Sequence, residues 1–566
     1  MKRLPMRHRV SVLLETLDLF DPELSNLPLH GANLATVEML RRIAVHERVE
    51  ALEVFLPPAA MVRVDQLSNV AQSVLPLSLR GQGRLSFYPT HAIPDVWSDA
   101  RERILFCLDP EWMARDRYLR DRFAIAPTPI SCDSHGFGHH RLWNPLARYA
   151  SAPPVAFDST VSLSVAARGA LQRMFSEFLN GGAPPPCRLD LIPHGINIDL
   201  FHPHDQAGKD DARRMLRLPL AKSITLFLGR VTAHGKADLL PLVRAFAAAS
   251  SDDDLLVIAG EEHPFGYGAK LREFGKSLGL GERIIIHPRV PPAFRSLYFA
   301  ASDVFVFPGD TVQETLGNTV MEAMATGLPC IISDWDGMRD MVIDGETGYK
   351  VPTYWMPGLD QMDAISPVTA LSLEFLLVAQ RAWVDTTQLT EALTALLRSP
   401  ETRAAMGAAG RARAECEFHW DRALERWVDL WDELAETAGA ESEAERAIRC
   451  SDIDRLGQPT PYDKIFAHYA TATIDDQLNS VRLSAYGHTV ASRASQLELY
   501  EETLPLTEAR IFDALLDTLS QIGSDWMTIG EALERAAAVS QRPTDKVRFH
   551  LSLLLKRDVL QLRRNE

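Results

Sequence analysis

The stretch "QETLGNTVMEAMATGLPCIIS", residues 313–333, contains a loop, an apolar helical run and the start of a β-strand. Gly317 and Asn318 can open the helix, with Asn318 as its cap, and Gly327 marks its end. The preceding run "DVFVFPG", residues 303–309, is typical of a buried strand, so the pattern predicts strand, helix and strand in a parallel sheet. The helix would begin at the carboxyl edge of that sheet, where open α/β sheets bind ligands.

Two glutamates flank the start of this helix, Glu314 in the loop and Glu322 in the second helical turn. Helical side chains lean toward the N-terminus, so the Glu322 carboxylate can reach a diol beside a phosphate bound at the first turn. Glu314 can meet whatever lies beyond that phosphate. A solvated helix face is the alternative explanation for such a pair. The backbone N–H groups that suit the phosphate belong to Leu316, Gly317, Asn318 and Thr319.

Similar strand patterns recur over the first 350 residues, each followed by a helical pattern. The strand-like runs lie at 9–15, 103–108, 188–193, 223–229, 254–260, 283–290, 303–309 and 329–333. Near-continuous apolar strands that alternate with helices predict parallel sheets covered on both faces. The polar stretch 194–222 predicts a hinge between two such sheets. We therefore expect an α/β fold with two Rossmann-like domains facing a cleft, over residues 1–200 and 201–400.

The strand signal disappears after about residue 395. Residues 401–440 are expected to be helices that close the two-domain fold, and 441–505 a helical connection. Residues 506–566 contain three helical patterns and a terminal strand pattern, which together predict a winged-helix-like module. The chain would therefore carry a mainly α C-terminal extension.

Composition narrows the class of protein. A length of 566 residues predicts two to four domains. The formal net charge of -16 argues against non-specific nucleic-acid binding, which requires a basic surface. Six scattered cysteines without metal-type spacing, and the lack of a long apolar run, predict a soluble cytoplasmic protein with reduced thiols.

Five motifs in order resemble the donor-binding half of glycosyltransferase family 4. They are "LGRVTAHGKADLLPLVRAF" (228–246), "VIAGEE" (257–262), "LYFAASDVFVFP" (297–308), "ETLGNTVMEAMATGLP" (314–329) and "SDWDGMRDMVIDGETGYKVP" (333–352). The resemblance covers about residues 190–352. It implies the two-Rossmann-domain GT-B fold and a retaining enzyme that uses a nucleotide sugar.

The resemblance also implies roles for the residues that match. Glu322 would hydrogen-bond the ribose hydroxyls of the nucleotide, and Glu314 would face the donor sugar. Arg230 and Lys236 would neutralise the diphosphate. Lys236 stands one residue later than in the common family pattern, because the order here is "HGK". The loop at Val290 would meet the base.

A histidine of the first domain completes the expected site. The stretch "PTPISCDSHGFGHHRLW", residues 127–143, resembles the family's strand and loop with a histidine at the cleft, and His135 is the match. The glycines between His135 and His139 argue against a helix that presents both to a metal. The candidate catalytic residues are thus Glu314, His135, Arg230 and Lys236.

Neither a cofactor nor a metal is expected beyond the nucleotide-sugar co-substrate. Asp334-Trp-Asp336 matches the metal-binding Asp-x-Asp of other glycosyltransferases, but it also fits an ordinary loop of this family. The acceptor stays open between a glycan, a lipid-linked molecule, a small molecule and a peptide. A sugar-phosphate synthase or phosphorylase of the same fold is one alternative. Another is a degenerate transferase that acts as a binding or scaffold protein through its C-terminal module. In either case, residues 506–566 are the candidate surface for a second copy of the chain or for a protein partner.

Overall fold

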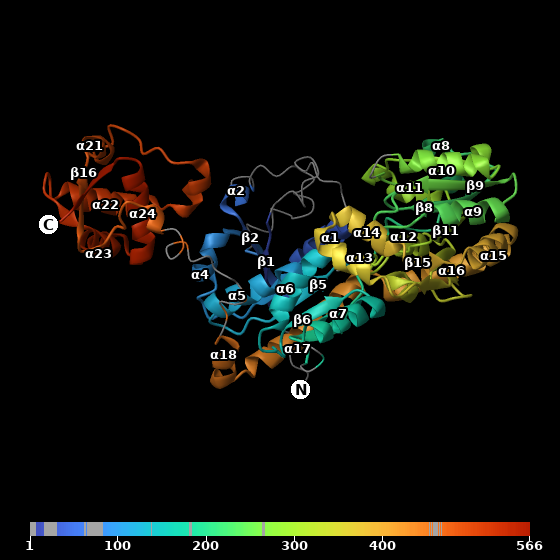
Figure 1. Ribbon diagram of the computed structural model, residues 1–566, viewed down its shortest axis with the longest axis horizontal. Helices are drawn as coiled ribbons and strands as arrows, with labels where there is room; N and C mark the ends of the chain where they lie inside the picture. Colours follow the sequence, from blue (N-terminus) through green and yellow to red (C-terminus); the bar gives the residue numbers. More distant parts are fainter. Residues whose placement is uncertain are drawn as a thin grey trace.

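The computed structural model contains two parallel sheets and a small C-terminal unit. The described residues are 7–15, 31–61, 64, 83–136, 138–179, 181, 184–262, 266–451, 453, 456, 462, 465 and 467–565. The C-terminal unit and the second sheet lie at opposite ends of the molecule, with the first sheet between them (Figure 1).

The first sheet has seven parallel strands in the order β3-β2-β1-β4-β5-β6-β7. Its strands are β1 (His8–Leu13), β2 (Val49–Leu56), β3 (Leu85–Pro89), β4 (Ile104–Cys107), β5 (Ile130–Ser134), β6 (Ser159–Ser162) and β7 (Arg188–Leu191). The accompanying helices are α1 (Gly31–Val45), α2 (Pro58–Met61), α4 (Ile93–Val96), α5 (Met113–Phe123), α6 (His140–Ala150) and α7 (Val165–Phe178). Strands β4 to β6 are buried along their whole length, as parallel strands covered on both faces must be.

The second sheet has six parallel strands in the order β10-β9-β8-β11-β12-β13. They are β8 (Ser223–Leu228), β9 (Asp254–Ala259), β10 (Ile284–His287), β11 (Val304–Phe307), β12 (Cys330–Ser333) and β13 (Gly348–Val351). Its helices are α8 (Gln206–Leu216), α9 (Leu240–Ala249), α10 (Tyr267–Ser277), α11 (Arg295–Ala300) and α12 (Asn318–Ala325), and η7 (Asp336–Asp340) is a 3-10 helix. The two sheets confirm the predicted α/β class.

The chain crosses between the sheets twice, at neighbouring positions. The first crossing runs through Ile196, whose backbone N–H donates to the carbonyl of Phe418 in the second crossing (2.6 Å). Gly195 allows this approach, because a Cβ atom there would lie 2.3 Å from the Cα of Trp420. The predicted polar hinge at 194–222 also contains helix α8, which Arg213 fastens to the second domain through Asp303 (2.8 Å).

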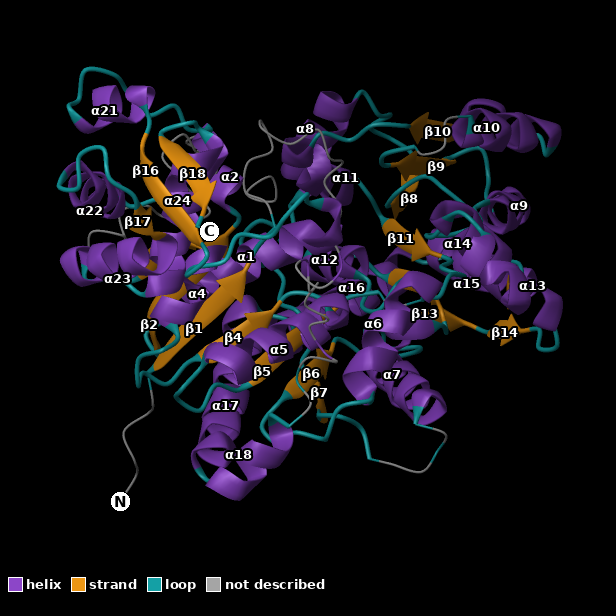
Figure 2. Cartoon of the chain, turned by 60° about the vertical axis from the view of Figure 1, so that its left-hand side comes forward, coloured by secondary structure: helices purple, strands orange, loops and turns teal. Residues whose placement is uncertain are grey.

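After the second sheet the chain returns to the first. The helices of this return are α15 (Thr386–Arg398), α16 (Pro400–Glu417), α17 (Trp420–Gly439) and α18 (Glu443–Arg449). Helix α17 runs along the first sheet (Figure 2). Its Trp427 packs edge-to-face on Phe106 of β4 (5.3 Å between ring centroids), and its Trp431 donates to Ser131 of β5 (2.9 Å). The first domain is thus completed by residues from beyond the second.

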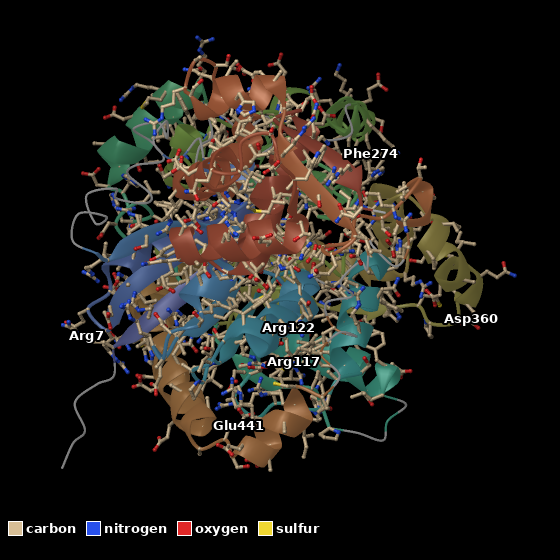
Figure 3. All side chains as sticks on the ribbon, turned by 90° about the vertical axis from the view of Figure 1, so that its left-hand side faces the viewer. Arg7, Arg117, Arg122, Phe274, Asp360 and Glu441 are labelled. Carbon is tan, nitrogen blue, oxygen red and sulfur yellow. The ribbon has the colours of Figure 1, made fainter. Side chains whose placement is uncertain are left out.

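Helix α18 continues this return as far as α5. Arg449 pairs with Glu441 (2.7 Å) and with Asp121 of α5. Figure 3 labels Arg117 and Arg122, which both belong to α5, and Glu441 below them. The ion pairs fix the end of the two-domain unit before the chain enters the C-terminal unit.

The C-terminal unit differs from its prediction in two strands, β16 and β17. Its elements are β16 (Asn479–Leu483), α21 (Ala485–Ala491), α22 (Ala509–Ser520), β17 (Met527–Thr528), α23 (Ile529–Ser540), α24 (Thr544–Lys556) and β18 (Leu560–Arg564). The three predicted helices and the terminal strand are present, but residues 441–505 are not wholly helical. Strand β16 lies between β17 and β18, and it pairs antiparallel with both. The short run "NSVRL" carries too weak a pattern to show a strand whose partner lies some 80 residues later.

Within the described part of the chain, no helix combines the length and the apolar character needed to cross a bilayer.

Gly260 is a position at which a side chain does not fit. Its φ is +146°, and a Cβ atom there would lie 1.7 Å from the carbonyl oxygen of Gly229. We expect Gly260→Ala to lower the free energy of unfolding by about 3–4 kcal/mol, because the ends of two adjacent strands would have to separate. Urea denaturation measures the change.

Gly279→Ala is the control, since Gly279 also has a positive φ (+80°) but no described heavy atom lies within 4 Å of its Cβ position. That variant should lose only the about 1–2 kcal/mol of a left-handed backbone. Equal losses in the two variants would contradict the steric argument.

Candidate active site

Helix α12 begins at the carboxyl edge of the second sheet, after the loop that follows β11. The N-cap is Gly317, with a left-handed φ of 93°, and Asn318 is the first helical residue. The prediction of Asn318 as the cap is therefore wrong. Glycine takes this place because the chain must turn through the left-handed region in a confined space, with a Cβ position only 3.0 Å from Met338. Leu316 is buried below, and Thr319 lies in the first turn.

Two of the predicted residues meet in front of this turn. Lys236 donates a hydrogen bond from Nζ to Glu314, and both side chains are mostly buried. Arg230 lies on the same loop as Lys236, with Nη2 3.4 Å from the carbonyl of Gly235. Burial lowers the pKa of the Arg230 guanidinium, while Glu314 and Glu261 oppose that shift. The structure thus brings Arg230, Lys236 and Glu314 together, although Lys236 stands one position late in the motif.

Glu322 is almost fully buried in α12 and has a partner that the sequence did not indicate. Arg295, the first residue of α11, forms an ion pair with its carboxylate at 2.6 Å. Burial raises the pKa of Glu322 to about 7, despite the opposing charge of Arg295. Arg295 lies 27 residues before Glu322, and only the packing of α11 beside α12 reveals it.

Val290 lies in the loop after β10, at the same edge of the sheet as α12. It is partly buried against the core of the second domain. The loop is held by the backbone N–H of Glu262, which donates to the carbonyl of Pro288 (3.1 Å).

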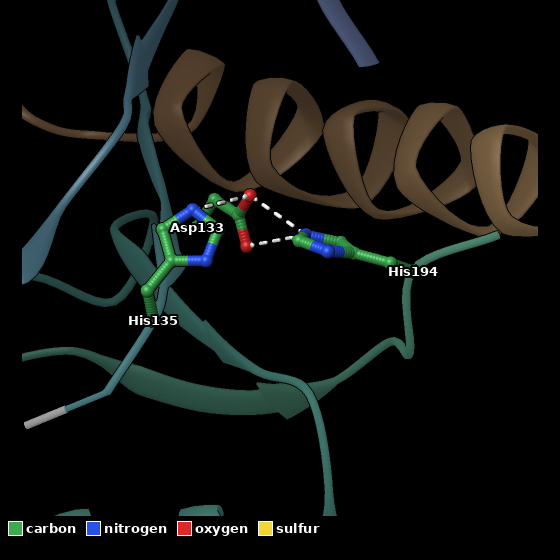
Figure 4. Close-up of side chains that lie close together, drawn as sticks. All are labelled: Asp133, His135 and His194. Carbon is green, nitrogen blue, oxygen red and sulfur yellow. Dashed lines mark hydrogen bonds and ion pairs between the residues drawn. The ribbon is translucent and has the colours of Figure 1, made fainter. Parts of the chain in front are cut away.

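His135 follows β5 of the first domain and belongs to a histidine–aspartate group (Figure 4). Its Nε2 lies 3.4 Å from Asp133 and 3.3 Å from the hydroxyl of Thr36. His194 contacts the same carboxylate at 2.8 Å. Burial acts to raise the pKa of Asp133, but the two imidazoles outweigh it and the pKa is lowered. Asp133 and His194, which sequence motifs did not mark, hold His135 in place.

These three side chains also form the one group, in the part of the chain that the structure describes, whose donor atoms converge closely enough to share an ion. The donor atoms lie within 4.8 Å of one another. The set differs from the histidines considered in the sequence, because the ring of His139 packs against Phe375 and His140 contacts Glu374. Two imidazoles and a carboxylate suit zinc or iron. In the structure, Nε2 of each ring already has a partner: that of His194 is bonded to Asp133 (2.8 Å), and that of His135 contacts Thr36 (3.3 Å).

Asp334 and Asp336 do not converge as a metal-binding Asp-x-Asp would. Asp334 pairs with Arg339 (3.3 Å). Asp336 turns through a positive φ of 47° and lies beside the Glu314 loop, where the backbone N–H of Gly337 donates to the carbonyl of Glu314. Burial and the nearby Glu314 raise the pKa of Asp336 well above its usual range, which favours a neutral carboxyl group and a poor metal ligand.

The two domains touch at this site. A Cβ atom on Gly138 would lie 2.5 Å from the side chain of Val312, and one on Gly136 would lie 3.0 Å from the carbonyl oxygen of Gln313. The loop after β5 therefore lies against the loop that carries Glu314. His135 and the Glu314–Lys236 pair therefore lie on loops of opposite domains that touch each other.

The fold and site define a class: two Rossmann-like domains with cations, carboxylates and a helix N-terminus at the facing sheet edges. Residues 222–358 match the family described as "Glycosyl transferases group 1", so the chain carries a group 1 glycosyltransferase domain.

Relatives of known name agree with this assignment. The chain is 33% identical over 186 residues to the D-inositol 3-phosphate glycosyltransferase of Corynebacterium diphtheriae, covering 31% of this chain and 43% of that protein. It is 26% identical over 266 residues to the enzyme of that name from Thermomonospora curvata, covering 45% and 54%. The chain thus spans about half the length of the relatives that it matches.

Solved structures support the fold. Sucrose-phosphate synthase of Thermosynechococcus elongatus aligns with a TM-score of 0.50 at 19% identity, over 76% of this chain and 99% of that one. Anabaena HepE, in complex with UDP and glucose, aligns with a TM-score of 0.50 at 14% identity, over 77% and 100%. At these identities the likeness shows the fold, which is the GT-B arrangement that the sequence predicted.

Removal of Arg295 would leave Glu322 buried without its cation. We expect Arg295→Ala to lower the free energy of unfolding by about 3 kcal/mol at pH 8. Without Arg295 the pKa of Glu322 would rise above about 7, so the folded protein would hold a proton that the unfolded chain has released. Rising pH would therefore favour the unfolded state of the variant. The difference in free energy of unfolding between wild type and Arg295→Ala should widen from pH 6 to pH 8.

Urea denaturation at several pH values measures this deficit, with the exposed Arg272→Ala of the same domain as control. A deficit that is independent of pH, or equal in the control, would show that the two charges are not coupled.

Proposed function

We propose that this chain is a retaining glycosyltransferase that moves a sugar from a nucleoside diphosphate sugar to an acceptor hydroxyl. One observation carries the proposal. Lys236 is bonded to Glu314 in the loop before α12, at the carboxyl edge of the second sheet. Arg230 lies on the loop of Lys236, and Glu322 lies within α12 itself. The group 1 domain supports a nucleotide-sugar donor, as does the fold shared with a neighbour solved with UDP.

When the donor binds, its phosphates and hydroxyls would replace the present partners in the ion pairs of the site. Its diphosphate would attract Lys236 and Arg230, which would release Glu314 to accept hydrogen bonds from the sugar. The N–H groups of residues 316–319 would complete the phosphate site, because first-turn groups have no partner within a helix. Glu322 would accept from the ribose hydroxyls, and Val290 would lie against the base.

Bond cleavage would be assisted mainly by electrostatics. As the bond from the anomeric carbon to the phosphate oxygen breaks, negative charge grows on the diphosphate, and Arg230 and Lys236 stabilise it in a site of low dielectric constant. The acceptor oxygen would attack from the same face and pass its proton to the departing phosphate oxygen, which gives retention. His135, oriented by Asp133, would position the reacting hydroxyls from the first domain.

Nucleotide binding tests the proposal first. We expect one class among UDP-, GDP-, ADP- and dTDP-sugars to raise the melting temperature and to be slowly hydrolysed. Glu322→Gln should weaken that nucleotide about tenfold or more, since an amide replaces the carboxylate that binds two hydroxyls. The exposed Glu346→Gln serves as control. No shift with any nucleotide would contradict the proposal.

The acceptor panel should contain neutral and phosphorylated sugars. Inositol 3-phosphate and sucrose phosphate occur in the names of two similar proteins, so a phosphorylated acceptor is a specific option. Turnover that requires free phosphate would instead indicate a phosphorylase.

Metal removal gives a separate prediction. Because cations and a helix N-terminus already face the phosphate site, we expect donor hydrolysis to continue unchanged after dialysis against EDTA. The rate is measured before and after dialysis, and again after Mg²⁺, Mn²⁺ or Zn²⁺ is added back. If activity is lost and one of these ions restores it, the reaction depends on a metal, which contradicts this prediction. Asp133, His135 and His194 would then be the first residues to test as its ligands.

A further inference from the structure

The chain leaves the second domain between β13 and α15 and returns after about thirty residues. This segment, called the excursion below, comprises residues 352–385. It contains β14 (Thr353–Trp355), α13 (Asp360–Ile365), η8 (Ser366–Val368), α14 (Leu371–Ala379) and β15 (Ala382–Val384). Strands β14 and β15 form a separate antiparallel pair. The family match ends at residue 358, before α13 and α14, so these helices lie outside the matched residues.

Glu374 of α14 reaches across to the first domain. It is 4% exposed, and its carboxylate lies 2.7 Å from Nδ1 of His140 and accepts from the backbone N–H of His140 (3.2 Å). His140 is the first residue of helix α6, so a carboxylate from one domain caps and neutralises the helix N-terminus of the other. Ser366 of the excursion also donates to Glu374 and holds the carboxylate in this position.

The next residue, Phe375, contacts one loop of each domain. A Cβ atom on Gly235 would lie 3.2 Å from its ring, so Phe375 packs directly on the turn before Lys236. The same ring meets that of His139 edge-to-face, with 6.1 Å between centroids. Helix α14 therefore contacts the Arg230–Lys236 loop and the loop that begins at His135.

We propose that Glu374 is a positioning residue for sugar transfer, which holds the loop of His135 against the loop of Lys236. This inference rests on the proposed function of the cleft. Residues 140 and 374 belong to different domains, and their bond is buried where the domains meet. Loss of the bond would leave the backbone N–H and the imidazole of His140 without this acceptor and would let the domains separate there. The proposed contacts to the nucleotide and the diphosphate all lie in the second domain, so donor binding should survive while the alignment with the first domain is lost.

Hydrogen–deuterium exchange of the full chain tests the contact without any substrate. In Glu374→Ala we expect the amides of residues 138–143 and 231–237 to exchange at least about tenfold faster, because a buried charged hydrogen bond is removed. Residues 231–237 make no hydrogen bond to Glu374, so a purely local loss of the helix cap would not affect them. Glu391→Ala, an exposed glutamate of α15, should leave both segments unchanged.

Kinetics with the nucleotide sugar found above give the second measurement. Glu374→Ala should lower kcat for transfer about tenfold to a hundredfold, while the donor Kd changes by less than about threefold. The ratio of donor hydrolysis to transfer should rise. Glu374→Gln, which keeps an oxygen for the His140 N–H, should fall between wild type and Glu374→Ala, and it replaces the alanine variant if that one does not fold.

Two results would overturn the inference. One is unchanged exchange at 231–237 in a folded Glu374 variant, and the other is a loss of donor affinity that matches the loss of kcat. If no nucleotide sugar is used at all, the proposed function fails, but the exchange experiment still decides whether Glu374 joins the two loops.

Discussion

Four pairs of ionisable side chains at this site let charge be buried, because each member lies beside a group that can carry the opposite charge. A buried charge without a partner would destabilise the fold by several kcal/mol, so the position of each one constrains the element that supplies the other. Two of these pairs lie within the second domain, one within the first, and one joins the two. The pairs are Lys236 with Glu314, Arg295 with Glu322, His194 with Asp133, and His140 with Glu374. A bound nucleotide sugar offers hydroxyls and phosphates that can replace the first two partners.

The two sheets face each other because the chain ties them together in more than one place. Helix α17 brings residues 420–439 back to the first sheet, where Trp427 and Trp431 fill its core. The crossings touch at Ile196 and Phe418. Helix α14 adds a contact on the cleft side. The domains are thus joined firmly near α17. On the side of the proposed site they are joined by loops and by Glu374, an arrangement that would let a donor enter.

The sequence predicted those parts of the site that lie on one short stretch. The positions of Glu314 before α12 and of Glu322 within it could be predicted from the strand and turn pattern alone. The ordered motifs added Arg230 and Lys236 as candidates. Arg295, His194 and Glu374 could not be found in this way, because their partners lie 27, 61 and 234 residues away along the chain. Local patterns report periodicity and caps, whereas these contacts depend on how helices and domains pack. The strand β16 was missed for the same reason.

A crystal structure of the protein with a nucleoside diphosphate would test the central claim most directly. The account predicts the diphosphate at the N-terminus of α12 between Arg230 and Lys236, with both ribose hydroxyls within hydrogen-bonding distance of Glu322 and with Lys236 moved from Glu314 toward phosphate. A nucleotide bound elsewhere, or one that leaves the Lys236–Glu314 pair intact and the ribose away from Glu322, would contradict it.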